Sequence, residues 1–173
     1  MIDPKMEQAM NDQINEEMYS AYLYQSMAAY FADENLDGFA TWMTAQAQEE
    51  MIHAMKFYNH ILERGGRVRL QSIAEPPSDF ESTLSVFEAA FEHEQHITGC
   101  INDLMDLAHE LKDYASMPML SWFVEEQVEE EDSADEMVQK VKMVADTGNG
   151  VYMLDKEVGQ RPVPFTMPAG EEE

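Results

Sequence analysis

Long stretches without helix-breaking residues are the feature of this sequence that most limits its fold. Between Lys5 and Gly65 there is no proline, and the only break is the segment ADENLDG at residues 32–38, whose Asn, Asp and Gly favour a turn. On both sides of this break, apolar residues recur at alternating steps of three and four, which places them on one helical face. The first 65 residues therefore predict two long helices joined by a short turn.

A longer connection follows the second predicted helix. Gly65 and Gly66 end that helix, as glycine commonly does at helix C-termini, and residues 67–80 form an irregular segment containing Pro76 and Pro77. A helix of about 28 residues is about 42 Å long, and about 14 extended residues reach about 46 Å. The connection can therefore run the length of the bundle, so that the second and third helices are parallel.

The second half of the chain predicts another helical pair. A third helix is expected over residues 81–111, and a fourth from Ser116, a candidate N-cap, to about residue 145. Pro118 fits this start because proline is tolerated in the first turn of a helix. No strand pattern is present. The predicted fold is all-α, a single domain consisting of a four-helix bundle at about residues 3–145, a short fifth helix at about 150–158 and a tail at 159–173.

Composition limits the classes of partner. The chain has 173 residues, enough for one domain with its own core. Its 35 acidic residues against 10 Lys and Arg give a formal net charge of -25, which repels nucleic acid and anionic membranes and attracts cations. Cys100 is the only cysteine, so Cys-rich metal sites are excluded. With no membrane-spanning segment or signal peptide, we expect a cytoplasmic protein that binds neither nucleic acid nor membranes.

Polar side chains interrupt the apolar face of every long helix. Counted from the two hairpin turns at about 1.5 Å per residue, they all lie about 20–30 Å from a turn and so share one layer of the bundle. These residues are Glu17 in the first helix, Glu50 and His53 in the second, Glu94 in the third, and Gln127 and Glu130 in the fourth.

Four carboxylates in one buried layer require a counter-charge, because each uncompensated buried charge costs several kcal/mol. Lys56 and Arg64 lie off the apolar faces and cannot supply it. Metal ions can, and hard carboxylate oxygens with one imidazole suit iron or manganese. A zinc protease motif of the H-E-x-x-H type and a G-x-S-x-G nucleophile motif are both absent. The pattern therefore predicts a di-metal carboxylate centre.

The segments that carry these residues resemble the non-haem ferritins of bacteria and archaea over nearly the whole chain. The resemblance implies a ferritin-like bundle that acts as a ferroxidase, oxidising ferrous iron with dioxygen or hydrogen peroxide. It also implies storage of the ferric product as a mineral in a hollow homo-oligomeric shell, usually of 24 subunits. The matching segments are NEEMYSAYLYQSMA (15–28), QEEMIHAMKFYNHI (48–61), ERGGRV (63–68), FEHEQ (91–95), FVEEQVEEE (123–131) and LDKEV (154–158).

The resemblance also implies roles for individual residues. One iron would be held by Glu17, Glu50 and His53, and the second by Glu94, Glu130 and the bridging Glu50. Gln127 and Tyr24 would lie beside this di-iron centre. A third iron site would be formed by Glu49, Glu126, Glu129 and Glu130. The alternative for Glu49 and Glu126 is a solvated helix face, since they lie about 100° around the helix from their ligand neighbours.

Related classes of protein remain as alternatives. Bacterioferritins have a second E-x-x-H pair in the fourth helix, where this chain has Gln127 and Glu130. Met51 occupies the position of their haem-ligating methionine, but non-haem ferritins share E-E-M-x-H, so we expect no haem. A rubrerythrin would need more cysteines. A peroxide-consuming di-iron protein, a di-iron oxygenase with a substrate cavity and a non-catalytic cation-binding shell protein are the other hypotheses.

Overall fold

The protein is an all-helical bundle, as the sequence predicts. The computed structural model describes residues 1–145 and 147–165, and the predicted tail at 159–173 lies outside the described residues from 166 onwards. None of the described helices is both long and apolar enough to cross a bilayer. The helices are α1 (Pro4–Asp33), α2 (Asp37–Glu63), α3 (Thr83–Leu111), α4 (Met117–Val144) and α5 (Gly148–Val158).

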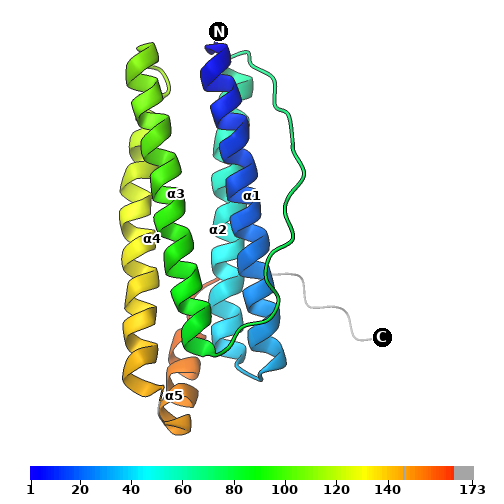
Figure 1. Ribbon diagram of the computed structural model, residues 1–173, viewed down its shortest axis with the longest axis vertical. Helices are drawn as coiled ribbons and strands as arrows, with labels where there is room; N and C mark the ends of the chain where they lie inside the picture. Colours follow the sequence, from blue (N-terminus) through cyan, green and yellow to red (C-terminus); the bar gives the residue numbers. More distant parts are fainter. Residues whose placement is uncertain (146, 166–173) are drawn as a thin grey trace.

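The two hairpins, α1–α2 and α3–α4, are joined by a crossover that runs the length of α1, so that α2 and α3 are parallel (Figure 1). The predicted topology is thus confirmed. Side chains of α1 hold the crossover in place by hydrogen bonds to its backbone. Asn11 is 3% exposed, and its amide donates to the Arg67 carbonyl at 3.1 Å and accepts from the Arg69 N–H at 2.6 Å. Further along, the Ser26 hydroxyl donates to the Pro77 carbonyl at 2.7 Å.

Helix ends follow the predicted positions with three corrections. Gly65 follows the α2 C-cap with φ of 70°, the left-handed conformation that favours glycine. The third helix begins at Thr83 rather than residue 81, because Ser82 and Ser85 form a reciprocal capping box. Ser116 precedes α4 but its hydroxyl does not cap the helix; it accepts from Arg64 and donates to Asp113. The fifth helix begins at Gly148, inside the segment expected to be a break.

Apolar side chains form two clusters, one on each side of the mid-bundle layer. Towards the α1–α2 turn, the Phe31 ring packs against Phe39 and Phe87 with centroids 5.2 and 5.5 Å apart. Towards the other end, Phe57 and Phe123 stack with centroids 4.3 Å apart. All of these rings are fully buried. The polar layer therefore lies between two closely packed apolar regions, which limit its contact with water.

Helix α5 packs against the start of α2, and this contact was not predicted. Leu36, at the α2 N-cap position, makes no side-chain cap. The carboxylate of Asp155, which is 1% exposed, instead accepts a hydrogen bond from the Phe39 N–H at 3.0 Å. Gly38 allows this approach, because a Cβ atom there would lie 1.7 Å from the Asp155 carbonyl oxygen. A side chain from α5 therefore satisfies the N-terminus of α2.

Candidate metal centre

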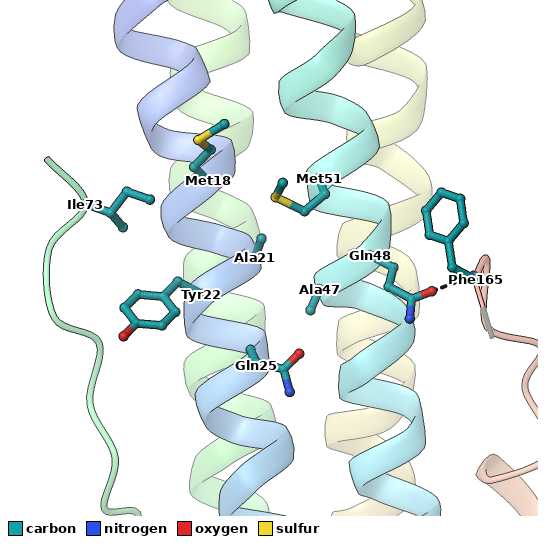
Figure 2. A pocket seen from close by; sticks show the side chains of 9 residues that line it. All are labelled: Met18, Ala21, Tyr22, Gln25, Ala47, Gln48, Met51, Ile73 and Phe165. Carbon is teal, nitrogen blue, oxygen red and sulfur yellow. Dashed lines mark hydrogen bonds between the residues drawn. The ribbon is translucent and has the colours of Figure 1, made fainter. Parts of the chain in front are cut away.

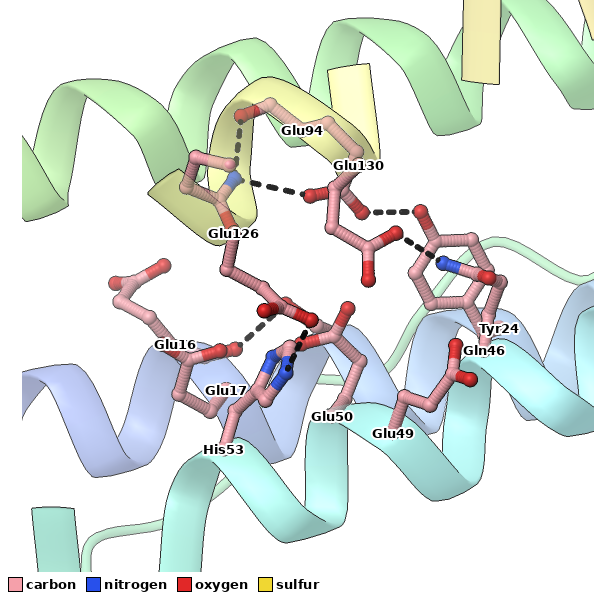
Figure 3. A network of polar contacts seen from close by, with 12 residues as sticks. Glu16, Glu17, Tyr24, Gln46, Glu49, Glu50, His53, Glu94, Glu126 and Glu130 are labelled. Atoms are coloured by element: carbon pink, nitrogen blue, oxygen red, sulfur yellow. Dashed lines mark hydrogen bonds and ion pairs between the residues drawn. The ribbon is translucent and has the colours of Figure 1, made fainter. Parts of the chain in front are cut away.

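The six polar residues predicted to share a layer are all buried in the middle of the bundle. Figure 3 shows the four carboxylates and His53 coming together. The Gln127 amide joins them by a hydrogen bond to Glu94. Charged side chains are rarely buried to this extent without a partner. No Lys or Arg among the described residues forms an ion pair with any of the four carboxylates. Their exposed fractions are 0% for Glu17, 2% for Glu50, 3% for His53, 1% for Glu94, 3% for Gln127 and 7% for Glu130.

One group of three donors lies between α1 and α2. Glu17, Glu50 and His53 each offer a ligand atom within 4.8 Å of the other two. His53 Nδ1 lies 3.4 Å from Glu50 Oε2. The Gln13 amide donates to Glu17 Oε1 at 2.9 Å, whereas Glu17 Oε2 is buried with no hydrogen-bond partner within residues 1–145 and 147–165. An unpartnered buried oxygen facing two other donors is a suitable position for a cation.

The second half of the layer comes from α3 and α4. His53 also meets Glu126 and Glu130, with one donor atom from each within 4.8 Å. Glu94 lies beside this trio. Its carboxylate accepts hydrogen bonds from the Tyr24 hydroxyl and from the Gln127 amide, the latter at 3.2 Å. Tyr24 and Gln127 therefore both lie beside the cluster, in contact with Glu94.

Two glutamines of the cluster were not predicted. Gln46 is 1% exposed and donates to Glu130 Oε2 at 2.7 Å, and Gln13 is 3% exposed and donates to Glu17. Each lies four residues before a carboxylate of the centre, at Glu50 and Glu17 respectively. Residues four apart share a helix face, so this repeated Q-x-x-x-E spacing could have identified both. Their amides fix carboxylate orientations that would otherwise be free.

Burial dominates the electrostatics of the centre. It raises the pKa of Glu17 and of Glu50 well above the ordinary range, and neighbouring carboxylates raise both further. Burial and then the charge of Glu94 raise the pKa of Glu130 to about 7. The pKa of Glu94 is also raised by burial, although hydrogen bonds from Tyr24 and Gln127 oppose this. A cation among these groups would stabilise their ionised forms and reverse the shifts.

The residues of the implied third iron site lie in different surroundings. Glu126 Oε1 is 3.9 Å from His53 Nε2, so this side chain turns towards the centre. Glu49 Oε2 is 2.6 Å from an Arg161 nitrogen and is therefore already paired with a cation. Glu129 is exposed and lines a surface hollow with Phe91 and Val128. The implied third site therefore shares Glu126 and Glu130 with the centre. Its remaining partly buried carboxylate, Glu49, is paired with Arg161.

Met51 lies away from the carboxylates, on the outer face of α1 and α2. It is 44% exposed and lines an apolar hollow of about 460 Å³ with Met18, Ile73 of the crossover and Phe165 (Figure 2). Phe165 is held there by its N–H, which donates to Gln48 Oε1 at 2.6 Å. The crossover and the C-terminal segment both contribute side chains to this face.

The donor set fits iron or manganese. Four buried carboxylates supply hard oxygen ligands, and one imidazole supplies nitrogen, with no thiolate among them. Carboxylate-bridged di-metal bundles take a carboxylate from each of four helices, and two of these helices also carry a histidine three residues after the carboxylate. This chain supplies the four carboxylates and one such histidine, His53 after Glu50. Its fourth helix instead carries Gln127 three residues before Glu130. The fold and the site therefore define a helical-bundle protein of the di-metal carboxylate class.

Comparisons with known proteins place the chain within this class. Residues 7–144 match the family described as Ferritin-like domain. The chain is 43% identical over 161 residues to a bacterial non-heme ferritin of Bacteroides fragilis, covering 93% of this chain and 100% of the relative. It is 37% identical to one from Staphylococcus aureus, covering 93% and 97%. An open pore ferritin from Archaeoglobus fulgidus superimposes with a TM-score of 0.92 at 47% identity, covering 94% and 100%. This chain is a member of the ferritin family.

Proposed function

We propose that this protein stores iron and that its mid-bundle centre is a ferroxidase, which oxidises ferrous iron before storage. The observation that carries this proposal is the buried layer of four carboxylates and one imidazole, contributed by four helices, with no Lys or Arg paired to it in the described residues. Such a layer favours ions of high positive charge, so it stabilises ferric over ferrous iron. Membership of the ferritin family supports iron as the metal.

Two ferrous ions are the substrates. Glu17, Glu50 and His53 would hold one of them, and Glu94 and Glu130 the other, with Glu50 between the two. Each ion loses one electron, and one dioxygen accepts both electrons and two protons to give hydrogen peroxide. With peroxide as the oxidant, the same two electrons and two further protons give two waters. Either reaction takes two electrons, one from each of two metal ions that must lie close together. Two half-sites that share Glu50 would hold the ions in this way.

Other residues would orient the ligands and control access to the centre. Tyr24 and Gln127 hold the Glu94 carboxylate, and Gln46 holds Glu130. Loss of a hydrogen bond to a group that holds a metal typically lowers metal affinity or activity by about 10–100-fold. The apolar clusters above and below would keep bulk water from the oxidised product. Glu49, Glu126, Glu129 and Glu130 are proposed to hold a third iron ion.

The stored mineral requires a container, and we propose a cytoplasmic shell of 24 copies of this chain. The chain matches its ferritin relatives over essentially their whole length, and the apolar hollow around Met51 offers a face that another subunit would cover. The charge of -25 would concentrate ferrous iron and favour mineral formation inside the shell. Size-exclusion chromatography with light scattering should give a mass near 24 chains, and a monomer or dimer would contradict it.

Stopped-flow oxidation kinetics test the ferroxidase proposal. Ferrous iron is added without oxygen, air-saturated buffer follows, and formation of ferric product is recorded. Glu50→Ala and His53→Ala should each lose the fast phase, whereas the matched exposed-residue variants Glu110→Ala and His109→Ala on α3 should retain it. Unchanged rates in the first pair would instead indicate a non-catalytic cation-binding shell. Anomalous scattering from iron-soaked crystals would give the number and identity of the bound ions.

A further inference from the structure

A second cluster of metal-ligating side chains lies between α1 and α3, outside the carboxylate centre. His96 and Cys100 are four residues apart on one face of α3, and Glu16 faces them from α1. His96 Nε2 is 3.1 Å from Glu16 Oε2 and 3.7 Å from Cys100 Sγ. One donor atom from each residue lies within 4.8 Å of the other two. We propose that Glu16, His96 and Cys100 form a binding site for a thiophilic divalent cation, with Zn²⁺ as the best match.

The donor types support zinc rather than iron. Zinc binds thiolate sulfur at about 2.3 Å, imidazole nitrogen at about 2.0–2.1 Å and carboxylate oxygen at about 2.0–2.2 Å, usually with four ligands in a tetrahedron. The three donors here are close enough to reach these distances after rotation of their side chains. The side chains of His96 and Glu16 are 56% and 37% exposed, which leaves the fourth position to water. The carboxylate centre contains no sulfur donor, so the two sites would prefer different metals.

The surroundings of the cluster are negatively charged. Beside it lies a hollow of about 280 Å³, to which Asp12, Glu16, Cys100 and Asp103 contribute. Burial, with the charges of Glu16 and Asp103, raises the pKa of the Cys100 thiol to about 11. Among the described residues, His96 is the only basic group paired with Glu16. A divalent cation would be attracted into this field and would stabilise the thiolate on binding.

Neighbouring groups separate this cluster from the proposed ferroxidase centre. His93, one turn before His96, is occupied by a hydrogen bond of 2.7 Å between its Nε2 and the Ser20 hydroxyl. Glu16 is adjacent in sequence to Glu17 but projects away from the centre (Figure 3). Gln13 lines the hollow and donates to Glu17, so its side chain lies between the two sites. The proposed cation site therefore uses none of the residues assigned to the proposed ferroxidase centre.

Cobalt(II) titration of the assembled protein, kept reduced with a phosphine, tests the proposal. A thiolate bound to Co²⁺ gives a charge-transfer band in the near ultraviolet, and because Cys100 is the only cysteine the band can come from this site alone. We expect a saturable band that Zn²⁺ removes. Cys100→Ser should abolish the band, and His96→Ala should weaken Co²⁺ affinity at least about tenfold. Circular dichroism checks that each variant is folded.

Two controls make the result specific. Glu50→Ala disrupts the carboxylate centre and should leave the band unchanged, and His109→Ala removes an exposed imidazole elsewhere on α3 and should do the same. Absence of the band in the unmodified protein at saturating Co²⁺ would overturn the proposal. A band that keeps its affinity in both His96→Ala and Glu16→Gln would also overturn it, because the thiol would then bind cobalt without the cluster.

Discussion

Replacing Glu130 by glutamine tests whether the centre holds its carboxylates at the expense of folding stability. Glu130 is 7% exposed, and burial followed by the charge of Glu94 raises its pKa from the ordinary 4.5 to about 7. In the unfolded chain this carboxyl group loses its proton near pH 4.5, whereas in the folded protein it loses it near pH 7. The folded protein therefore binds more protons between these values, so its stability falls as pH rises from about 4.5 through 7.

The size of this effect follows from the two pKa values. At about 1.4 kcal/mol per pH unit, ionising Glu130 in the folded protein costs about 3 kcal/mol above pH 7. Glutamine has nearly the same shape but no charge, and its amide oxygen can accept the hydrogen bond that Gln46 now donates. Metal-free Glu130→Gln should therefore be more stable than the unmodified protein by about 3 kcal/mol at pH 8 and by under about 1 kcal/mol at pH 5.

Guanidinium unfolding of the metal-free protein, followed by circular dichroism at both pH values, measures this difference. Glu129→Gln is the matched control, because the adjacent Glu129 is exposed and its replacement should change stability by no more than about 0.5 kcal/mol at either pH. Added ferrous iron, without oxygen, should stabilise the unmodified protein more than Glu130→Gln. Equal stability changes at pH 5 and pH 8 would refute the reasoning.

Two further predictions concern a pair of helical glycines and the contact between Arg161 and Glu49. Gly99 lies in α3 with no atom near the position of an added Cβ, so Gly99→Ala should stabilise the protein by about 0.5–1 kcal/mol. Gly38→Ala should instead destabilise it by at least about 1–2 kcal/mol, because the new Cβ displaces Asp155 from its cap on α2. Guanidinium unfolding measures both, and stabilisation by Gly38→Ala would refute the docking of α5. Arg161→Gln should free the Glu49 carboxylate and tighten binding of a third metal ion about fivefold. Anaerobic calorimetric titration with ferrous iron measures this, and unchanged affinity would contradict competition by Arg161.

The helices and the composition of the central layer were predictable from sequence. The period of apolar residues is local information, so it fixed the four long helices and placed Glu17, Glu50, Glu94 and Glu130 on their inner faces. The helical rise then placed these residues at a common height, because two hairpins of similar length leave little freedom along the axis. The Q-x-x-x-E spacing of Gln13 and Gln46 was equally local and could have been used in the same way.

Other contacts depended on how separate segments pack, and no periodic pattern in the sequence encodes them. The Asp155 cap on Phe39 joins residues 116 positions apart, and the pairing of Arg161 with Glu49 joins residues 112 apart. Glu16 and Cys100 lie on different helices, and only the distance and rotation of α1 relative to α3 bring them together. The sequence by itself determined the helices and the charge of their buried layer, because both follow from the order of residues along one helix. Tertiary structure alone decided which exposed and terminal side chains meet, since that depends on the packing of one helix against another.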